Sequence, residues 1–433
     1  MHMAQHKLPN GIPLYTLDVP SSKLCSVQIW FKAGSALEEK DNLGMAHFLE
    51  HMFFKGTPTR PKANIAKEVE SFGADINAFT SFNYTCYYIN TPQKHVTKAY
   101  EILLDMISNP MFLNEDIVPE REVVFEEYRR SIDSPSQYHF LQLQKNSFTK
   151  KGYNHPILGQ EKTIKNFSQK QLRDFRKKNY NKNNCFIVIA GNIEKKISEF
   201  SLKARSFKMP QGPKTLFPPF KLLHEGSSSF HTKETAMCQL TLSFEALKLT
   251  DKKMAAQDLA INALALGDSS PLYRKLVLEG THASDVSGST LYFTNGGVHL
   301  MKIVFPIENY EKVKENFLTL INDLITHGPN YEDVKKIKNQ YLASKIYEKE
   351  SLESLAFSLG HSLALTDNPH LSVKFIRPSL KSFLPSFILN FKFLKRKRIF
   401  FPLIKSLQNL LNPLKKLKQK SKNGIASAIM SKK

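Results

Sequence analysis

The segment DNLGMAHFLEHMFFKGTP, residues 41–58, constrains the fold of this chain more than any other. Read as a helix, it carries an apolar core stripe on one face, with members spaced i, i+4, i+7 and i+8. The stripe consists of Met45, Leu49, Met52 and Phe53. The other face holds two histidines and a glutamate in the string HFLEH (47–51), flanked by Phe54. A helix covered on both sides buries these polar groups, which need partners there.

The ends of this helix are marked in the sequence. Asp41 or Asn42 is expected to cap the start of the helix, because short polar side chains accept hydrogen bonds from the first free N–H groups. Gly56, followed by Thr57 and Pro58, is expected to end it.

The polar face has the residues of a metal site. His47 and His51 are four apart and so project from one face of the helix, with Glu50 beside them. Two imidazoles one turn apart can share a zinc ion, and a nearby carboxylate can act as general base on water held by that ion. The alternative is a polar helix face that holds two histidines by chance. Burial of the helix favours the metal site.

A third protein ligand has to come from another segment. The predicted helix at 114–133 is rich in glutamate, and two of these residues, Glu120 and Glu127, are seven apart and share a face. One could bind the metal while the other orients a histidine ligand. The competing interpretation is an acidic, solvated helix surface.

Three segments together resemble a known family. The runs GMAHFLEHMFFKGTPTRP, INAFTSFNYTCYY and EREVVFEE follow one another in the order found in the pitrilysin/insulinase family of inverted (HxxEH) zinc metallopeptidases. The resemblance covers residues 7 to about 365. Within the family, the chain resembles the short two-domain members, which include mitochondrial processing peptidase subunits and bacterial zinc proteases.

The resemblance implies a role for each matching residue. His47 and His51 match the zinc-binding histidines, and Glu50 matches the general base. Glu127 matches the distal zinc ligand, and Glu120 matches a glutamate that supports a histidine ligand. One Zn²⁺ per chain is therefore expected.

Two further points concern register and substrate. Glu126 is the alternative to Glu127 as distal ligand if the alignment with the family is shifted by one residue, although Glu126 points about 100° away around the helix.

Asn77, Ala78 and Phe79 resemble the edge strand that holds an extended peptide by backbone pairing in this family. The alternative for these three residues is an ordinary strand.

The chain departs from the family in its second half. Active members carry an Arg and a Tyr seven positions apart there, and these positions hold Val277 and Ser284. Arg274 and Tyr273 are nearby but wrongly spaced. The resemblance implies peptide substrates and a homodimer or a heterodimer. We therefore expect that this chain is the zinc-bearing half of a pair and needs a related subunit for full activity.

The pattern of apolar residues predicts an α+β fold, and the family resemblance implies two homologous α/β-sandwich domains. Strand-like alternation occurs at 26–35 and again at 238–247, which suggests a duplicated unit. The predicted organisation is an N-terminal zinc-binding domain at 1–206, a linker at 207–229, a homologous non-catalytic domain at 230–370 and an atypical basic tail at 371–433. The second domain is incomplete if this tail does not fold.

The net charge of +22 comes mostly from the tail. Sixteen of the 61 Lys and Arg lie beyond Asp367, the last acidic residue, which leaves residues 1–367 with a net charge of +6. No specific nucleic-acid partner is therefore expected for the body. For the tail, three interpretations stay open: a shifted reading frame or degraded end, a patch that touches anionic surfaces such as membranes or nucleic acid, and a divergent folded end.

Composition narrows the class of protein. No apolar run of membrane-spanning length and no targeting segment occur, so we expect a cytoplasmic globular protein. The four cysteines form no CxxC pair and are expected to be small buried residues. The favoured function is a zinc metalloendopeptidase acting on short or unfolded polypeptides. Its rivals are a catalytically weak or structural subunit of a peptidase-like heterodimer and a basic binding protein with a structural zinc.

Overall fold

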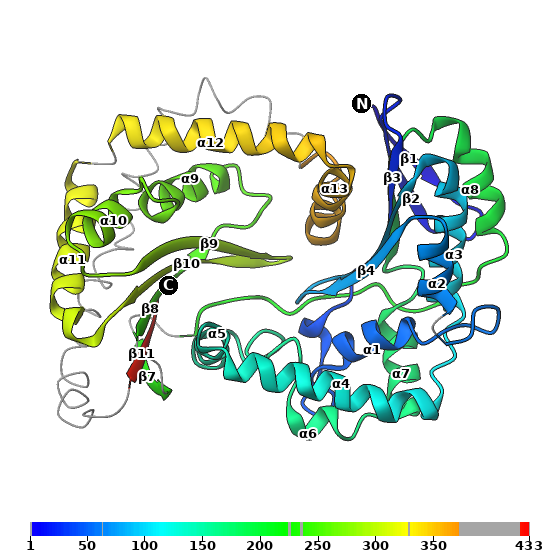
Figure 1. Cartoon of the computed structure of the whole chain (residues 1–433), viewed down its shortest axis with the longest axis horizontal. Helices are drawn as coiled ribbons and strands as arrows, with labels where there is room; N and C mark the ends of the chain where they lie inside the picture. Colours follow the sequence, from blue (N-terminus) through cyan, green and yellow to red (C-terminus); the bar gives the residue numbers. More distant parts are fainter. Residues whose placement is uncertain are drawn as a thin grey trace. The chain divides into compact units, whose positions relative to one another are not determined.

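The computed structural model describes residues 2–62, 64–223, 227–233, 237–327, 330–371 and 425–432. The chain forms two compact units that alternate along the sequence (Figure 1). Unit 1 contains Met1–Arg130, Lys151–Pro218 and Ile346–Ser372. Unit 2 contains Ser131–Lys150, Pro219–Lys345 and the strand at 425–432. The sequence analysis predicted two consecutive domains, at 1–206 and 230–370. It did not predict that each unit combines segments from separate parts of the chain.

Unit 1 is built on a six-stranded sheet in the order β1-β2-β6-β3-β5-β4. Its strands are β1 (His2–Lys7), β2 (Pro13–Asp18), β3 (Leu24–Phe31), β4 (Asp75–Thr80), β5 (Thr85–Pro92) and β6 (Cys185–Gly191). All neighbours pair antiparallel except β2 and β6. Strand β4 is therefore an edge, paired with β5 on one side only.

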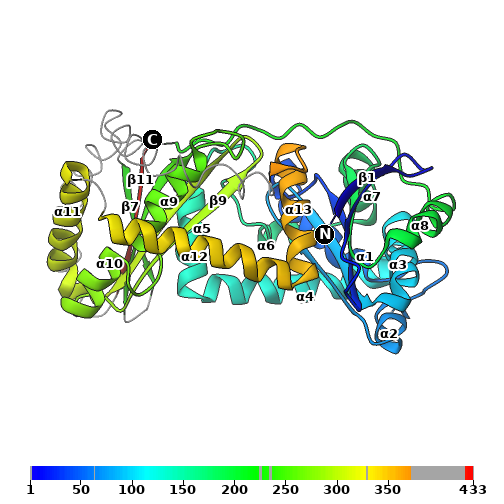
Figure 2. The same ribbon diagram turned by 90° about the horizontal axis from the view of Figure 1, so that it is seen from above.

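Helices cover both faces of this sheet. They are α1 (Met45–Phe53), α2 (Asn64–Ser71), α3 (Val96–Ser108), α4 (Asn114–Asp133), α6 (Glu161–Ile164), α7 (Gln169–Asn179), α8 (Ile197–Ala204) and α13 (Leu352–Thr366). On β3, Val27, Ile29 and Phe31 enter the core shared with α1 and α3, while Trp30 faces α13. This alternation makes a three-layer sandwich, with α13 lying along the sheet in both views (Figures 1 and 2).

Unit 2 repeats the plan with a five-stranded sheet in the order β7-β11-β8-β10-β9. The strands are β7 (Ser227–Lys233), β8 (Cys238–Ala246), β9 (Asp285–Phe293), β10 (Gly296–Phe305) and β11 (Ile425–Lys432). The helices are α5 (Pro135–Ser147), α9 (Met254–Ala265), α10 (Pro271–Tyr273), α11 (Tyr310–His327) and α12 (Tyr331–Glu350), the last of which continues into unit 1.

Most predicted elements are present. The repeated strand patterns at 26–35 and 238–247 are β3 and β8, and the α+β class is confirmed. Helices α12 and α13 are separated by Ser351, whose hydroxyl caps α13. All four cysteines are buried, as expected.

The tail also yields one element within the described residues. Strand β11 pairs parallel with β8 and antiparallel with β7, so the chain's last segment joins the sheet of unit 2. The rest of the basic tail, from 372 to 424, lies outside the described residues, so the interpretation of the tail as a patch for anionic surfaces stays a prediction. Among the helices that the structure describes, none combines the length and apolar character needed to cross a membrane.

Candidate functional site

The predicted metal ligands converge within unit 1. Helix α1 supplies His47 and His51, and α4 supplies Glu127. One ligand atom from each of the three lies within 4.8 Å of the other two. The Nε2 atoms of His47 and His51 lie 3.7 and 3.6 Å from Glu127 Oε2. In the part of the chain that the structure describes, no other group of three His, Cys, Asp or Glu is arranged in this way.

This donor set fits a zinc ion. Ligands bonded at 2.0–2.1 Å in a tetrahedron stand about 3.3 Å apart, close to the separations between the two Nε2 atoms and the carboxylate oxygen. Burial, reinforced by the neighbouring His51, lowers the pKa of His47 to about 3, so His47 is neutral and its ring can offer a lone pair. Two imidazoles and one carboxylate are also the ligand types of many catalytic zinc sites.

Glu50 has the features of a general base. It lies on α1 between the two histidines and is only 9% exposed. Burial raises the pKa of Glu50 to about 7, although a hydrogen bond from Thr80 Oγ1 to its Oε2 works in the opposite direction. A carboxyl group that titrates near neutral pH can both accept and return a proton. Nothing in the sequence pointed to Thr80, since its contact depends on how β4 packs against α1.

Glu120 contacts Nδ1 of His51, the ring nitrogen that does not face Glu127. Its Oε1 lies 2.7 Å from His51 Nδ1, and its Oε2 pairs with Lys55 Nζ. Burial works to raise the pKa of Glu120, but the interactions with His51 and Lys55 outweigh it and hold the pKa below its usual value. An ionised Glu120 accepts a hydrogen bond from Nδ1–H of His51, which leaves the Nε2 lone pair free for a metal.

Glu126, the alternative to Glu127 as third ligand on α4, does not approach the histidines. Glu126 is more than half exposed and its Oε1 lies 2.6 Å from Arg129 Nη1, on a different side of the helix from Glu127. Glu127 is the glutamate that meets the two histidines, as the family resemblance implies.

The start of α1 differs from the prediction. The helix begins at Met45, and neither Asp41 nor Asn42 caps it. The buried carboxyl group of Glu38 does so instead, accepting hydrogen bonds from Gly44 N at 2.7 Å and Ala46 N at 2.8 Å. Burial raises the pKa of Glu38 to about 8, and the two N–H groups oppose that shift. An acceptor six to eight residues upstream gives no local signal, so the sequence favoured the nearer polar residues.

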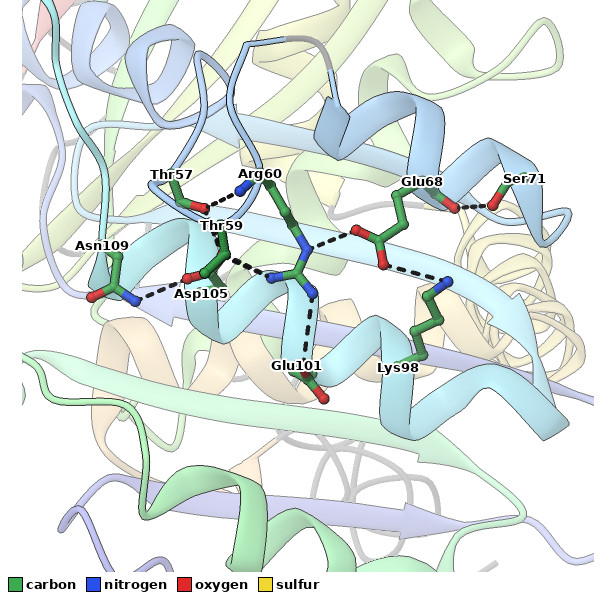
Figure 3. Close-up of polar contacts among 9 residues, drawn as sticks. All are labelled: Thr57, Thr59, Arg60, Glu68, Ser71, Lys98, Glu101, Asp105 and Asn109. Atoms are coloured by element: carbon green, nitrogen blue, oxygen red, sulfur yellow. Dashed lines mark hydrogen bonds and ion pairs between the residues drawn. The ribbon is translucent and has the colours of Figure 1, made fainter.

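The loop after α1 is held by Asp105 of α3. Figure 3 shows Thr57, Thr59 and Arg60 converging on this carboxylate, at 2.6, 2.7 and 2.7 Å from its Oδ2. Asp105 is almost fully buried. Gly56, at φ +114°, makes the turn into this loop, as predicted for the end of the helix.

The predicted substrate strand is the sheet edge β4. Asn77, Ala78 and Phe79 lie on it, next to Thr80, which contacts Glu50. The N–H of Ala78 donates to Oδ1 of Asn77 at 2.8 Å. Phe79 packs against Trp30.

With this geometry described, the sequence was compared with known proteins. The model of the insulinase family, peptidase family M16, matches residues 15–161, and that of the peptidase M16 inactive domain matches residues 166–341. This chain belongs to the insulinase family.

Individual relatives agree with the family. A protein of Rickettsia felis named an uncharacterized zinc protease is 28% identical over 83% of this chain and 86% of its own length. The mitochondrial-processing peptidase subunit beta of Saccharomyces cerevisiae is 33% identical over 46% of this chain and 43% of that subunit. The crystal structure of a protease from Helicobacter pylori superimposes with a TM-score of 0.76 at 20% identity, over all of both chains, which supports the fold.

The family's Arg and Tyr positions are occupied by residues with structural contacts in unit 2. Val277 packs against the apolar core of unit 2, and Ser284 bonds to Val304 O where β9 begins. Arg274 lies 3.4 Å from Asp333 in an ion pair, and Tyr273 packs on the same core.

A polar cluster in unit 2 was not predicted. Thr290 Oγ1 lies 2.8 Å from His299 Nδ1 and 3.3 Å from Asp258 Oδ1. The same Nδ1 atom lies 3.7 Å from Asp258 Oδ1. A hydrolytic triad needs its hydroxyl and its carboxylate on opposite nitrogens of the imidazole, so this cluster is not one.

The cap on α1 can be tested by its effect on stability. In Glu38→Gln, one backbone N–H would face an amide NH₂ group, so the loss of that hydrogen bond is expected to lower the free energy of unfolding by roughly 1–3 kcal/mol. Glu39→Gln, at an exposed neighbour, is the matched control and is expected to change little. Denaturant unfolding of both variants measures the difference, and equal stabilities would contradict the assignment of Glu38 as the cap.

Proposed function

We propose that this chain is a zinc-dependent metalloendopeptidase that cleaves short or unfolded polypeptides. The observation that carries the proposal is the meeting of His47 and His51 Nε2 with the Glu127 carboxylate, next to a buried Glu50. Membership of a peptidase family and the zinc protease names of relatives support it.

Each group has a distinct role in this proposal. His47, His51 and Glu127 would hold the zinc, which would supply a Lewis acid for the peptide carbonyl and would lower the pKa of the attacking water. Glu50 takes the proton from that water and gives it to the leaving amine. Thr80 donates to Glu50 and orients it. Glu120 orients His51.

The edge strand suggests how substrate is held. An extended peptide can add to a free edge through main-chain hydrogen bonds, which are independent of side-chain identity. Asn77, Ala78 and Phe79 provide this edge beside Glu50. A peptide folded into its own helix or sheet has no free backbone to offer, which is why short or unfolded substrates are favoured.

A second candidate is a subunit with little activity of its own. Val277 and Ser284, in place of the family's Arg and Tyr, favour it, because the chain then lacks two groups that assist substrate. Several relatives are named subunits of a processing peptidase. A dimer with a related chain that supplies these two groups reconciles this candidate with the peptidase.

The role of Glu50 is tested by Glu50→Gln. The amide cannot accept the proton, so kcat for a quenched fluorescent peptide is expected to fall by about 10²–10⁴-fold. The zinc content is expected to stay near one ion per chain, because Glu50 is not a ligand. If wild type and variant both bind zinc and cleave at equal rates, Glu50 is not the base. If neither cleaves, the subunit candidate is favoured.

The ligand set is tested by paired substitutions on α4. Glu127→Ala is expected to lose zinc, measured by metal analysis after dialysis, because only two protein ligands remain. Glu126→Ala, one residue away and bonded to Arg129, is the matched control and is expected to retain zinc. The reverse pattern would mean that the register of α4 is off by one.

Pairing with β4 is tested by modifying the substrate. N-methylation removes one main-chain donor, and successive residues of a strand point their N–H groups to opposite sides. Methylation at alternate residues of a peptide is therefore expected to slow cleavage about tenfold or more, while methylation at the residues between them has a small effect. Equal effects at all positions would argue against strand addition.

A further inference from the structure

Lys55 is a charged residue near the proposed metal centre that the proposed chemistry does not use. It follows the end of α1 and is four residues after His51. Its ammonium group pairs with Glu120 Oε2, and only about a third of its side chain is exposed. Glu120 itself is buried, with 6% of its side chain exposed.

The two oxygens of Glu120 have different partners. Oε1 faces His51 Nδ1 at 2.7 Å, and Oε2 faces Lys55 Nζ. The terminal torsion of a glutamate is soft, so a carboxylate with one partner can turn. A carboxylate held at both oxygens by separate partners has a fixed plane. The direction of the His51 ring, and of its Nε2 toward Glu127, follows from that plane.

Lys55 projects from a backbone that is itself held in place. Its N–H donates to Met52 O at 3.3 Å, and the next residue, Gly56, bridges to Pro61. The loop that follows is fastened to the buried Asp105 through Thr57, as Figure 3 shows together with the partners of Arg60. The ammonium group therefore reaches Glu120 from a fixed base.

We propose that Lys55 is a positioning residue that sets the zinc affinity of this site by holding Glu120 in the plane that orients His51. The inference rests on the proposed zinc site and goes beyond its ligands. Exposed ion pairs contribute little, but this pair ends on a buried carboxylate that also holds a proposed ligand. The charge of Glu120 lies between the ammonium group and the histidines, so it offsets repulsion between Lys55 and a bound cation.

The test compares zinc affinity in four proteins by competition with a chromophoric chelator: wild type, Lys55→Met, Lys55→Arg and Lys67→Met. Lys55→Met keeps the apolar stem and removes the charge, and its zinc dissociation constant is expected to rise about tenfold, the lower end of the range for residues behind metal ligands. Lys55→Arg restores a donor and is expected to remain within about threefold of wild type. Lys67→Met, at an exposed lysine on α2, is the control and is expected to match wild type.

Cobalt substitution gives a second readout that does not depend on catalysis. The visible absorption of Co²⁺ reports ligand geometry, so its bands are expected to shift in Lys55→Met and to return in Lys55→Arg. Unchanged zinc affinity in Lys55→Met would overturn the inference, and an unchanged cobalt spectrum would overturn the proposed effect on ligand geometry. The inference would also be overturned if Lys55→Arg lost as much zinc affinity as Lys55→Met, since the lysine would then act through packing.

The outcomes separate this inference from the proposed function. If wild type binds zinc and Lys55→Met binds it equally well, the role of Lys55 fails while the zinc site stands. If wild type binds no zinc, the proposed function fails. Should Lys55→Met not fold, as judged by circular dichroism of the metal-free protein, Lys55→Gln carries the same expectation and the same decision.

Discussion

The burial of a polar helix face inside an apolar sandwich is the constraint on which the rest of unit 1 depends. Helix α1 packs one side into the core with Phe48 and Leu49, and yet His47 and Glu50 are only 8% and 9% exposed. A buried carboxyl group or imidazole without a partner costs several kcal/mol. The neighbouring segments supply partners: Glu127 from α4 for the histidines and Thr80 from β4 for Glu50.

The same constraint explains why both ends of α1 are anchored by buried acidic side chains from outside the helix. Glu38 accepts the first N–H groups, and Asp105 holds the loop after Gly56. At the start, Gly44 is at φ +92°, and a Cβ there would lie 2.6 Å from Leu158 O, so the backbone has no room to shift toward that loop. Two imidazoles that must share one ion need a helix that neither slides nor rotates, and these anchors provide it.

Whether a site residue could be predicted depends on how far it lies in the sequence from the residues it contacts. His47, Glu50 and His51 are four residues or fewer apart, so helical periodicity alone places them together. Glu127 is a long-range partner and needed the family resemblance to find it, while Glu38 and Thr80 left no signal because their contacts arise from loop and strand packing. Lys55 could have been found, since it is four residues after His51 and so continues the face that Glu120 approaches.

The fold shows the same division between local and long-range information. Alternating apolar residues predict β3 and β8, because each strand's pattern is contained in ten residues. Nothing local indicates that α13 returns to unit 1, where a Cβ on Gly360 would lie 2.2 Å from the Trp30 ring. The close approach of this helix to the sheet requires both the missing side chain at 360 and the flat indole at 30, and these are separated by most of the chain.

Strand β4 connects the two halves of the proposed chemistry. Residues 77–79 offer the edge for a substrate backbone, and Thr80, the next residue, donates to Glu50. A strand is stiff along its length, so a peptide paired with this edge takes its register from the same backbone that positions the base. The distance between the attacked carbonyl and Glu50 is thereby set by main-chain geometry, which every peptide shares. Such an arrangement accommodates many sequences, and it leaves selection among them to side-chain contacts outside the edge.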